Sequence, residues 1–501
     1  MKRKVLSILL SLCMVLTMVP TAFAAGDSTI PEEGETGSEV AKIDDESYNT
    51  LKDAFVAAQD GDTIELTADV SLTEKITVDK SVKLNADKHT IAGVTGDAGV
   101  CFEITGGTFT VSGGTFTAFG DTADTVTGAG VFKIPSTANN AKIAVTDATV
   151  EKFNRAAFDV RNGEFDIINC TINCDNEQTS RLTKAVVAGY DANGTVRGTV
   201  TGCKITGSNS TYEGWSASGI EVSAGSNVTV EDTSIESMKG GISVARNYGH
   251  DKANVIVNNC TIDANDFAMR IFESNNSDDP VENTSAQLTV NGGTYKGDVR
   301  VSIGDEKTAD GKSVIEIKGG AFSGITTDGF EKFVGKGYLA DKTGEGAYQV
   351  VAASDAAASI ETESGSTQYA TLEWAGAAAS EGQIVNLLKD VTLTQKLTIS
   401  KAITLDGGNH TITGQADSTE VYIEITGGNV TVQNLAVKDF GGNAVTVSQW
   451  GLFKVPEGEH TTGKLTLKNV IASNFNPFPE ALLLSDPPCR HHRAVPHRYP
   501  G

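Results

Sequence analysis

Apolar and polar residues alternate over short stretches along most of the chain, and a six-residue unit recurs among them. The unit has the form apolar, any residue, Asn/Asp/Gly, two further residues, apolar, as in Ile167–Ile172 and Val257–Ile262. A period of two is typical of β-strands, and Asn, Asp and Gly tolerate the left-handed backbone of sharp turns. Eight such units, 22 to 34 residues apart, begin at Val111, Val145, Ile167, Val200, Val230, Val257, Val290 and Ile317.

A second short strand, with apolar residues on either side of a variable one, lies between these units. Its copies are Phe158–Val160, Ile220–Val222, Ile242–Val244, Met269–Ile271 and Val299–Val301. No helix pattern of 10–15 residues separates the strands, which excludes α/β layouts. Repeats of this length indicate a solenoid, in which successive coils stack as parallel strands and bury their inward side chains on one another. A β-sandwich is the alternative fold.

A much longer repeat covers residues 48–156, which recur at 369–476. An offset of 321 residues places Gly61 on Gly382 and His89 on His410. The apolar residues of 48–59 have helical spacing, and we expect this helix to cover the open end of the first solenoid, where edge strands would otherwise pair with other chains.

The N-terminus has the features of a secretory signal peptide, residues 1–24. Basic residues at positions 2–4 precede an apolar stretch, Val5–Val19, and the small-residue site Ala22–Ala24. No later stretch approaches the ~20 apolar residues of a membrane span. We therefore expect a secreted protein, extracellular or associated with the cell wall, without a membrane span in its mature chain.

Composition changes along the chain predict its remaining boundaries. We expect an acidic linker at 25–47, a first solenoid at 48–351, a linker at 352–368 and an incomplete second solenoid at 369–476. The basic tail, 477–501, is rich in Pro, His and Arg, unlike anything before it, and we interpret it as the product of a frameshift. In an intact, longer product we would expect further solenoid and a region for attachment to the cell wall.

The net charge and the cysteine positions limit which ligands, cofactors and disulfides we expect. The net charge of −24 disfavours nucleic acid, whose binding depends on neutralising phosphates. No EF-hand loop, calcium-binding repeat or zinc-ligand spacing is present, so we predict no cofactor, although an acidic exterior could attract Ca²⁺. Cys170, Cys203 and Cys260 occupy the same place in their six-residue units, which favours stacked, buried thiols over a disulfide framework.

The chain resembles the right-handed parallel β-helix superfamily, the pectate-lyase-like fold. The resemblance is carried by Asn169–Ile172 and Asn259–Ile262, and by the Gly-Ile-x-Val strands Gly219–Val222 and Gly241–Val244. The segment 315–350 is similar to units of large secreted surface proteins of Gram-positive gut bacteria. The resemblance implies an all-β, right-handed solenoid in two tandem copies, but not one activity, because the fold hosts lyases, hydrolases, epimerases, adhesins and inert stalks.

The middle residues of the second type of strand form a candidate site. They are Asp159, Glu221, Ser243, Arg270 and Arg300, which we expect to form an outward column. Two acids followed by two arginines could grip an acidic sugar, since Arg binds carboxylates through two parallel hydrogen bonds. The clustered Asp residues that the resemblance to lyases would require are missing, and we favour the interpretation that these charges are simply solvated.

Three aromatic residues, Tyr212, Trp215 and Tyr248, lie on neighbouring loops and could form a platform for sugar stacking. Two hypotheses follow. We favour a non-catalytic secreted or surface solenoid, a stalk or adhesin that binds a polysaccharide or a host or bacterial surface glycan, because a stalk gains reach from tandem copies. The alternative is a carbohydrate-active enzyme, a polysaccharide lyase or glycoside hydrolase acting on an acidic polysaccharide.

Overall fold

The structure is a computed structural model, which describes most of the chain from residue 39 onward. The signal peptide predicted at 1–24 and the tail at 477–501 lie outside the described residues. The described residues are 39–123, 130–175, 183–189, 195–207, 218–223, 225–246, 252–273, 285–302, 313–362, 365–444, 452–455 and 464–475.

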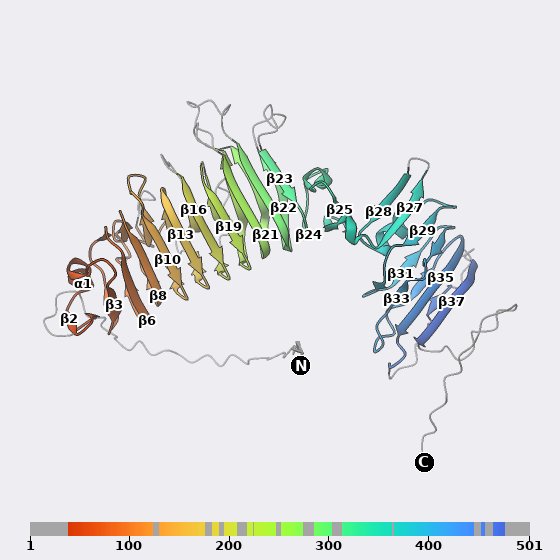
Figure 1. Cartoon of the computed structure of the whole chain (residues 1–501), viewed down its shortest axis with the longest axis horizontal. Helices are drawn as coiled ribbons and strands as arrows, with labels where there is room; N and C mark the ends of the chain where they lie inside the picture. The colour runs from red at the N-terminus through yellow and green to blue at the C-terminus, as the bar shows by residue number, and fades with distance from the viewer. Residues whose placement is uncertain are drawn as a thin grey trace, which may run out of the picture.

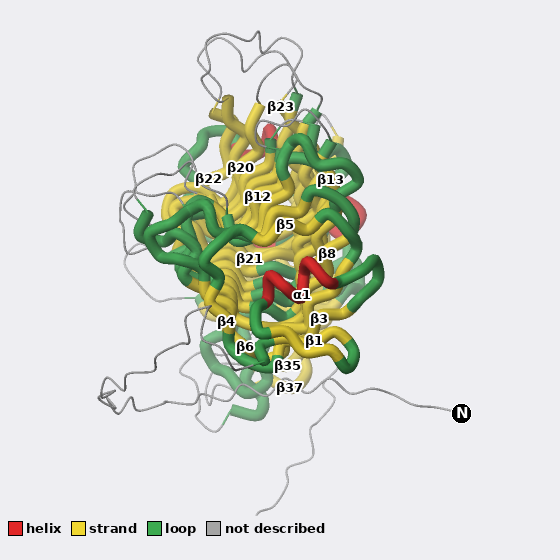
Figure 2. Tube along the Cα trace, turned by 90° about the vertical axis from the view of Figure 1, so that its left-hand side faces the viewer, coloured by secondary structure: helices red, strands yellow, loops and turns green. Residues whose placement is uncertain are grey.

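The described chain is an all-β structure built mostly of parallel strands. Strands β1 to β26 belong to one hydrogen-bonded network of 26 strands, and the later strands form sheets of eight and three. Between residues 63 and 323, each strand pairs in parallel with the corresponding strand of the following coil. The coils succeed one another along the long axis, and an end-on view shows their strands lying one behind another (Figures 1 and 2).

Three ladders of strands run along this part of the chain, here called the first, second and third ladder in the order in which each coil meets them. The first ladder comprises β3 (Thr63–Leu66), β6 (Val82–Ala92), β8 (Thr108–Thr117), β10 (Lys142–Thr146), β13 (Gly163–Ile168), β16 (Val196–Thr201), β19 (Asn227–Glu231), β21 (Ala253–Glu273), β22 (Ala286–Ser302) and β23 (Ser313–Ile317). The second contains β4 (Val70–Ser71), β11 (Thr149–Val150), β14 (Thr171–Asn173), β17 (Lys204–Thr206), β20 (Ser234–Arg246) and β24 (Gly320–Ser323). The third contains β5 (Ile76–Val78), β7 (Phe102–Ile104), β9 (Phe132–Ile134), β12 (Ala156–Val160), β15 (Lys184–Ala188) and β18 (Ser218–Val222).

Several strands are long enough to join more than one ladder: β6 and β8 continue into the second, β20 continues into the third, and β21 and β22 run through all three. Register follows the six-residue unit throughout. The first residues of the eight units are paired in one unbroken series from Val111 to Ile317, and their last residues from Phe116 to Phe322. The strands and pairings that the unit predicted are confirmed.

The third residue of the unit makes the turn between the first two ladders. Asp147, Asn169, Asp232 and Asn259 all have φ between 46° and 56°, in the left-handed region. Few residues with a Cβ atom enter this region readily, and Asn and Asp are among them. At this turn the side chains also stack, since Nδ2 of Asn259 donates to Oδ1 of Asp232 over 2.8 Å. The preference for Asn, Asp or Gly at the third position of the unit therefore follows from the left-handed backbone that this turn requires.

The fourth residue of the unit points into the core, and the cysteines stand there as free thiols. Cys170, Cys203 and Cys260 are buried, as predicted. They do not form an uninterrupted series, because Thr233 occupies this position between Cys203 and Cys260, and its Oγ1 accepts a hydrogen bond from the Cys203 amide over 3.2 Å. Burial raises the pKa of the Cys260 thiol to about 11, so this side chain behaves as a small apolar group.

The first end of the coil stack is covered by a helix and a hairpin. Helix α1 (Leu51–Ala57) begins at Thr50, whose Oγ1 accepts from the Asp53 amide over 3.0 Å, and it buries Phe55 against the core. Strands β1 (Ala41–Ile43) and β2 (Glu46–Tyr48) form an antiparallel hairpin, and β1 pairs with β3. The helical cover agrees with prediction, whereas part of the expected linker at 25–47 is in the hairpin, where it satisfies the edge of β3.

The opposite end is closed by antiparallel strands and aromatic residues. Strand β26 (Ala347–Ala352) pairs with β24 and with β25 (Tyr338–Gly344). The 3₁₀ helix η2 (Phe330–Phe333) places Phe330 between Phe322 and Tyr348, with ring centroids 5.1 and 4.4 Å away. A second 3₁₀ helix, η3 (Ala353–Asp355), then leads away from this end.

Residues 358–475 repeat the same arrangement around a core of their own. Here too a hairpin, which lies in the expected linker at 352–368 except for its last residue, Tyr369, pairs with the first parallel strand, and a helix follows it. Asp341 of β25 accepts from the Thr371 amide over 2.6 Å and thus connects the two parts. The elements are β27 (Ala358–Thr362), β28 (Gly365–Tyr369), α2 (Leu372–Ala378), β29 (Ile384–Leu387), β30 (Val391–Thr392), β31 (Leu397–Ile399), β32 (Thr404–Asp406), β33 (Thr411–Thr413), β34 (Ile423–Ile425), β35 (Asn429–Phe440), β36 (Phe453–Lys454) and β37 (Lys464–Phe475).

Stacked phenylalanines make the core of the first coils a sensitive place for substitution. Phe132 lies between Phe102 and Phe158, with ring centroids 5.6 and 5.1 Å away, and is 1% exposed. We expect Phe132→Ala to leave a cavity and lower the free energy of unfolding by about 3–5 kcal/mol. Val56→Ala, at a side chain that is 70% exposed on α1, is the control and should change it by less than about 0.5 kcal/mol. Chemical denaturation measures both, and equal effects would contradict this account of the core.

Candidate functional site

The column predicted from the middle residues of the second strand type exists in the third ladder. Glu221, Ser243, Arg270 and Arg300 are register partners on four adjacent strands. Asp159 belongs to the same column, but Val187 of β15 stands between it and Glu221. Lys133 and Glu103 extend the column beyond Asp159.

The charges of this column are largely buried, which differs from the interpretation that they are solvated. Asp159 is 0% exposed, Arg270 4% and Glu221 5%, and only Arg300 is half-buried. A buried charge is costly unless another charge or a set of hydrogen bonds compensates for it. The contacts of each side chain therefore decide what the column can do.

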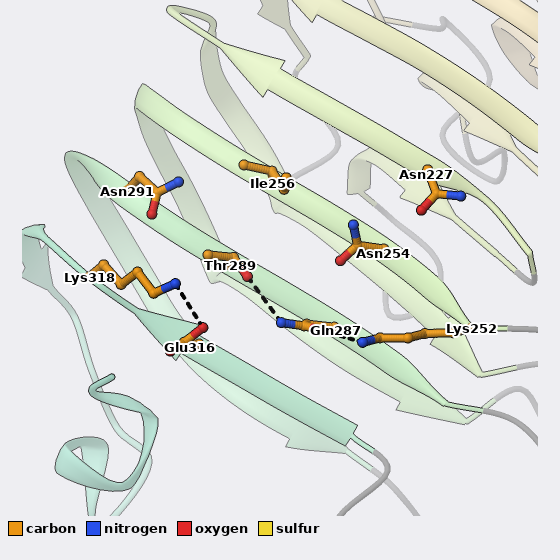
Figure 3. A pocket seen from close by; sticks show the side chains of 9 residues that line it. All are labelled: Asn227, Lys252, Asn254, Ile256, Gln287, Thr289, Asn291, Glu316 and Lys318. Atoms are coloured by element: carbon orange, nitrogen blue, oxygen red, sulfur yellow. Dashed lines mark hydrogen bonds and ion pairs between the residues drawn. The ribbon is translucent and has the colours of Figure 1, made fainter. Parts of the chain in front are cut away.

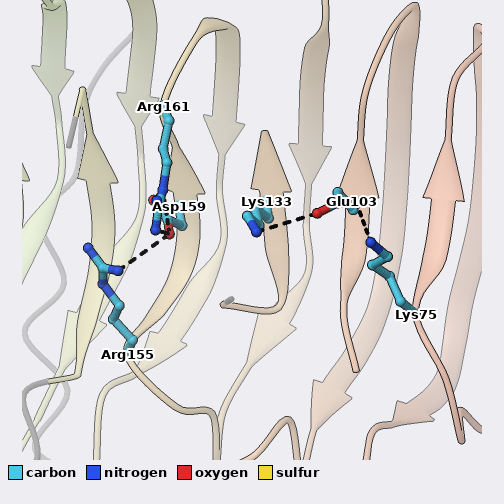
Figure 4. Close-up of polar contacts among 6 residues, drawn as sticks. All are labelled: Lys75, Glu103, Lys133, Arg155, Asp159 and Arg161. Carbon is cyan, nitrogen blue, oxygen red and sulfur yellow. Dashed lines mark hydrogen bonds and ion pairs between the residues drawn. The ribbon is translucent and has the colours of Figure 1, made fainter. Parts of the chain in front are cut away.

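Asp159 is held by arginines of its own coil. Its carboxylate accepts from Nε of Arg161 over 3.2 Å and from Nη2 over 2.9 Å, and Arg155 approaches to 3.9 Å. Figure 4 shows both arginines converging on this carboxylate. A planar guanidinium bound through two nitrogens is the strongest arrangement available to a carboxylate in a protein. A ligand or metal ion would have to displace Arg161 to reach Asp159.

Glu103 lies between two lysines, in an arrangement that recurs at a second place among the described residues. Lys75 and Lys133 both contact its carboxylate, the latter over 3.4 Å (Figure 4). Burial alone would raise the pKa of Glu103, but the hydrogen bond from Lys75 and the charge of Lys133 outweigh it and hold that pKa below its ordinary value. The same triad recurs at Glu424 with Lys396 and Lys454, each 321 positions later.

Glu221 pairs with a lysine that sequence patterns did not single out. Nζ of Lys184 lies 2.7 Å from the Glu221 carboxylate, and both side chains are nearly inaccessible to solvent. Lys184 is the first residue of strand β15. Residues 184–188 lack the alternation of apolar and polar residues that marks the neighbouring strands, so the pattern does not predict this strand. The register partner of Glu221 on this strand is Val187, so the contact with Lys184 is made by the side chain and follows neither from register nor from a local pattern.

Arg270 is the one column residue with an incomplete set of contacts. Its guanidinium lies between the rings of Phe267 and Phe272, 4.2 and 4.5 Å from their centroids, and its Nε donates to Oγ of Ser243 over 3.0 Å. In the part of the chain that the structure describes, its Nη2 is buried without a hydrogen-bond partner. Desolvation lowers the pKa of Arg270 to about 10, against a smaller opposing effect of the Glu221 charge.

Arg300, at the end of the column, has an acidic partner for both of its terminal nitrogens. Its two terminal nitrogens each donate to Asp266 over 2.9 Å, and Asp298 lies 3.8 Å away. Glu103 and Lys133, which the sequence analysis did not include, could have been found from the internal repeat, since Glu424 and Lys454 match them. Tyr212, Trp215 and Tyr248, the predicted aromatic platform, lie outside the described residues.

A second feature is a shallow groove on the outward face of the first ladder. It crosses β19, β21, β22 and β23 and has a volume of about 550 Å³. Figure 3 shows polar side chains rising from adjacent strands along it. The lining residues are Asn227, Lys252, Asn254, Ile256, Gln287, Thr289, Asn291, Glu316 and Lys318.

Neither the described residues nor comparisons with known proteins point to a further site. The described residues contain no cluster of three His, Cys, Asp or Glu side chains suited to a metal ion. Among them, no helix is both long enough and apolar enough to cross a membrane. A comparison of the chain with protein families found no match, and a comparison with curated proteins found none.

The buried pair of Lys184 and Glu221 provides a test of how the column is stabilised. Lys184→Met would leave the Glu221 carboxylate buried without a counter-charge, so we expect the free energy of unfolding to fall by about 3–5 kcal/mol. Replacing both residues by Met should recover most of this loss, because the isolated charge is removed as well.

The matched control is the exposed pair of Lys296 and Asp263, which lie 2.8 Å apart with side chains 62% and 52% exposed. Lys296→Met should cost less than about 1 kcal/mol, because water screens this pair. Denaturant titration of the four proteins measures the differences. A loss in Lys184→Met no larger than that in Lys296→Met would show that the buried pair does not stabilise the column.

Proposed function

We propose that this chain is a right-handed parallel β-helix in two tandem copies, and that it acts as a non-catalytic secreted or cell-surface stalk or adhesin. The in-register parallel ladders, and the recurrence of helix, hairpin and lysine–glutamate triad at matching positions, support this fold. The basic and apolar pattern of residues 1–24 supports export.

The observation that carries the functional proposal is that the column's carboxylates are engaged with basic side chains. Asp159 is bound by Arg161, Glu221 by Lys184, and Glu103 by two lysines. A general acid, base or nucleophile must reach its substrate, and one held in a buried ion pair must first give up that partner. Repetition of the triad around Glu424 further supports a stabilising role, since a stalk extended by duplication repeats its stabilising contacts with each copy.

One observation favours the alternative, a carbohydrate-active enzyme acting on an acidic polysaccharide. Arg270 and Arg300 are adjacent in the column, and Arg270 retains a terminal nitrogen without a described partner. A guanidinium of this kind is suited to a sugar carboxylate. Its burial and its position between two phenylalanine rings instead favour a structural role.

An assay of polysaccharide cleavage distinguishes a non-catalytic stalk or adhesin from a carbohydrate-active enzyme. We expect the full chain, incubated with polygalacturonate and with alginate, with and without Ca²⁺, to release neither unsaturated products nor new reducing ends. Ultraviolet absorbance and a reducing-sugar assay measure the two, and a commercial polysaccharide lyase serves as positive control. Product formation that Arg270→Lys abolishes would overturn the non-catalytic proposal and place the activity in the column.

A further inference from the structure

The groove on the first ladder has a regular chemistry that the stalk function does not use. Asn227, Asn254 and Gln287 are register partners on three adjacent strands. Neighbouring strands lie about 4.8 Å apart, so these side-chain amides recur at one fixed interval across the face. Such an arrangement suits an extended ligand with a short repeat, lying across the strands.

The hydrogen-bonding capacity of two of these amides is unused within the described residues, where the side chains of Asn227 and Asn254 have no hydrogen-bond partner. The Gln287 amide is partly engaged, because it donates to Thr289 over a long 3.5 Å and its oxygen accepts from Lys252. Each amide offers two donor hydrogens and an acceptor oxygen on one side chain. A sugar hydroxyl group also donates and accepts, so the row of amides complements a row of hydroxyls.

The charge of the whole chain disfavours a polyanionic ligand, although the groove itself has one lysine more than it has acidic residues. Lys318 pairs with Glu316 over 3.0 Å, and Lys252 donates to the neutral Gln287 side chain. The chain as a whole carries a net charge of −24, which repels polyanions at a distance. A neutral polymer meets no such barrier.

The groove also has an apolar component. Ile256 is a half-buried lining residue, and Val314, which is 42% exposed and is the register partner of Gln287, lies beside the groove without lining it. Sugar rings present C–H groups on their faces and hydroxyls around their rims. Aliphatic side chains beside amides therefore match both surfaces of such a ring.

We propose that this groove binds an uncharged, hydroxyl-rich glycan, with the amides of Asn254 and Gln287 as its central hydrogen-bonding groups and Ile256 beneath a sugar ring. The site is distinct from the charged column, since it lies on a different ladder. The inference rests on the proposed adhesin function and specifies the class of its ligand.

Titration calorimetry of the full chain with cellohexaose and mannohexaose, and with hexagalacturonate as the charged counterpart, tests the proposal. We expect binding of at least one neutral hexasaccharide, weaker by about tenfold or more in Asn254→Ala/Gln287→Ala, because two hydrogen bonds of about 1 kcal/mol each are lost. Asn85→Ala is the matched control: Asn85 is an exposed amide on β6 of the same ladder, outside the groove.

Each contrary outcome identifies what fails. Equal affinity in all three proteins would overturn the groove as the site while leaving glycan binding intact. Preference for hexagalacturonate, or no binding of either neutral hexasaccharide, would overturn the ligand class. The proposed non-catalytic function is tested by a different assay, and product formation from polyuronides would contradict it. Equal denaturation midpoints of the variants and the parent protein establish that a lost affinity does not come from unfolding.

Discussion

The whole structure depends on one constraint: the backbone hydrogen bonds of each coil are made with the coils on either side. In the first ladder this pairing continues from Val111 to Ile317 through eight units without a change of register, and the register shifts among these coils lie between the second and third ladders. Since an unpaired N–H or C=O group is costly when buried, a coil is stable only between two others or beneath a cover. The hairpins next to β3 and β29 and the antiparallel strand next to β24 supply such covers at three ends, whereas β37 pairs on one side only within the described residues.

Much of this architecture could be predicted from the sequence, because the chain encodes it locally. The turn at Asn169 or Asp232 needs a left-handed residue, and the apolar residues on either side need burial, so the unit marks a turn and two strands wherever it occurs. The column from Glu221 to Arg300 was predictable for the same reason, since equal positions in successive units become neighbours.

What could not be predicted depends on contacts between positions that do not repeat. Lys184 neutralises Glu221 from another coil, and Arg161 reaches Asp159 from beyond the end of the strand, so neither the pairing nor the burial follows from the unit. The hairpins at 41–48 and 358–369 lie in segments whose composition is that of linkers, and only the unfilled edges beside them explain their pairing.

The direction of the hydrogen bonds has a mechanical consequence. Coils succeed one another along the long axis and strands run across it, so the bonds between coils lie along that axis (Figure 1). Tension applied to the ends of the chain would detach one terminal coil at a time, straining few bonds at once, and a coil of about 30 residues would release about 100 Å of extended chain. The shared side-chain core resists bending across the same axis. A structure of this kind is stiff when undisturbed and would lengthen stepwise under load.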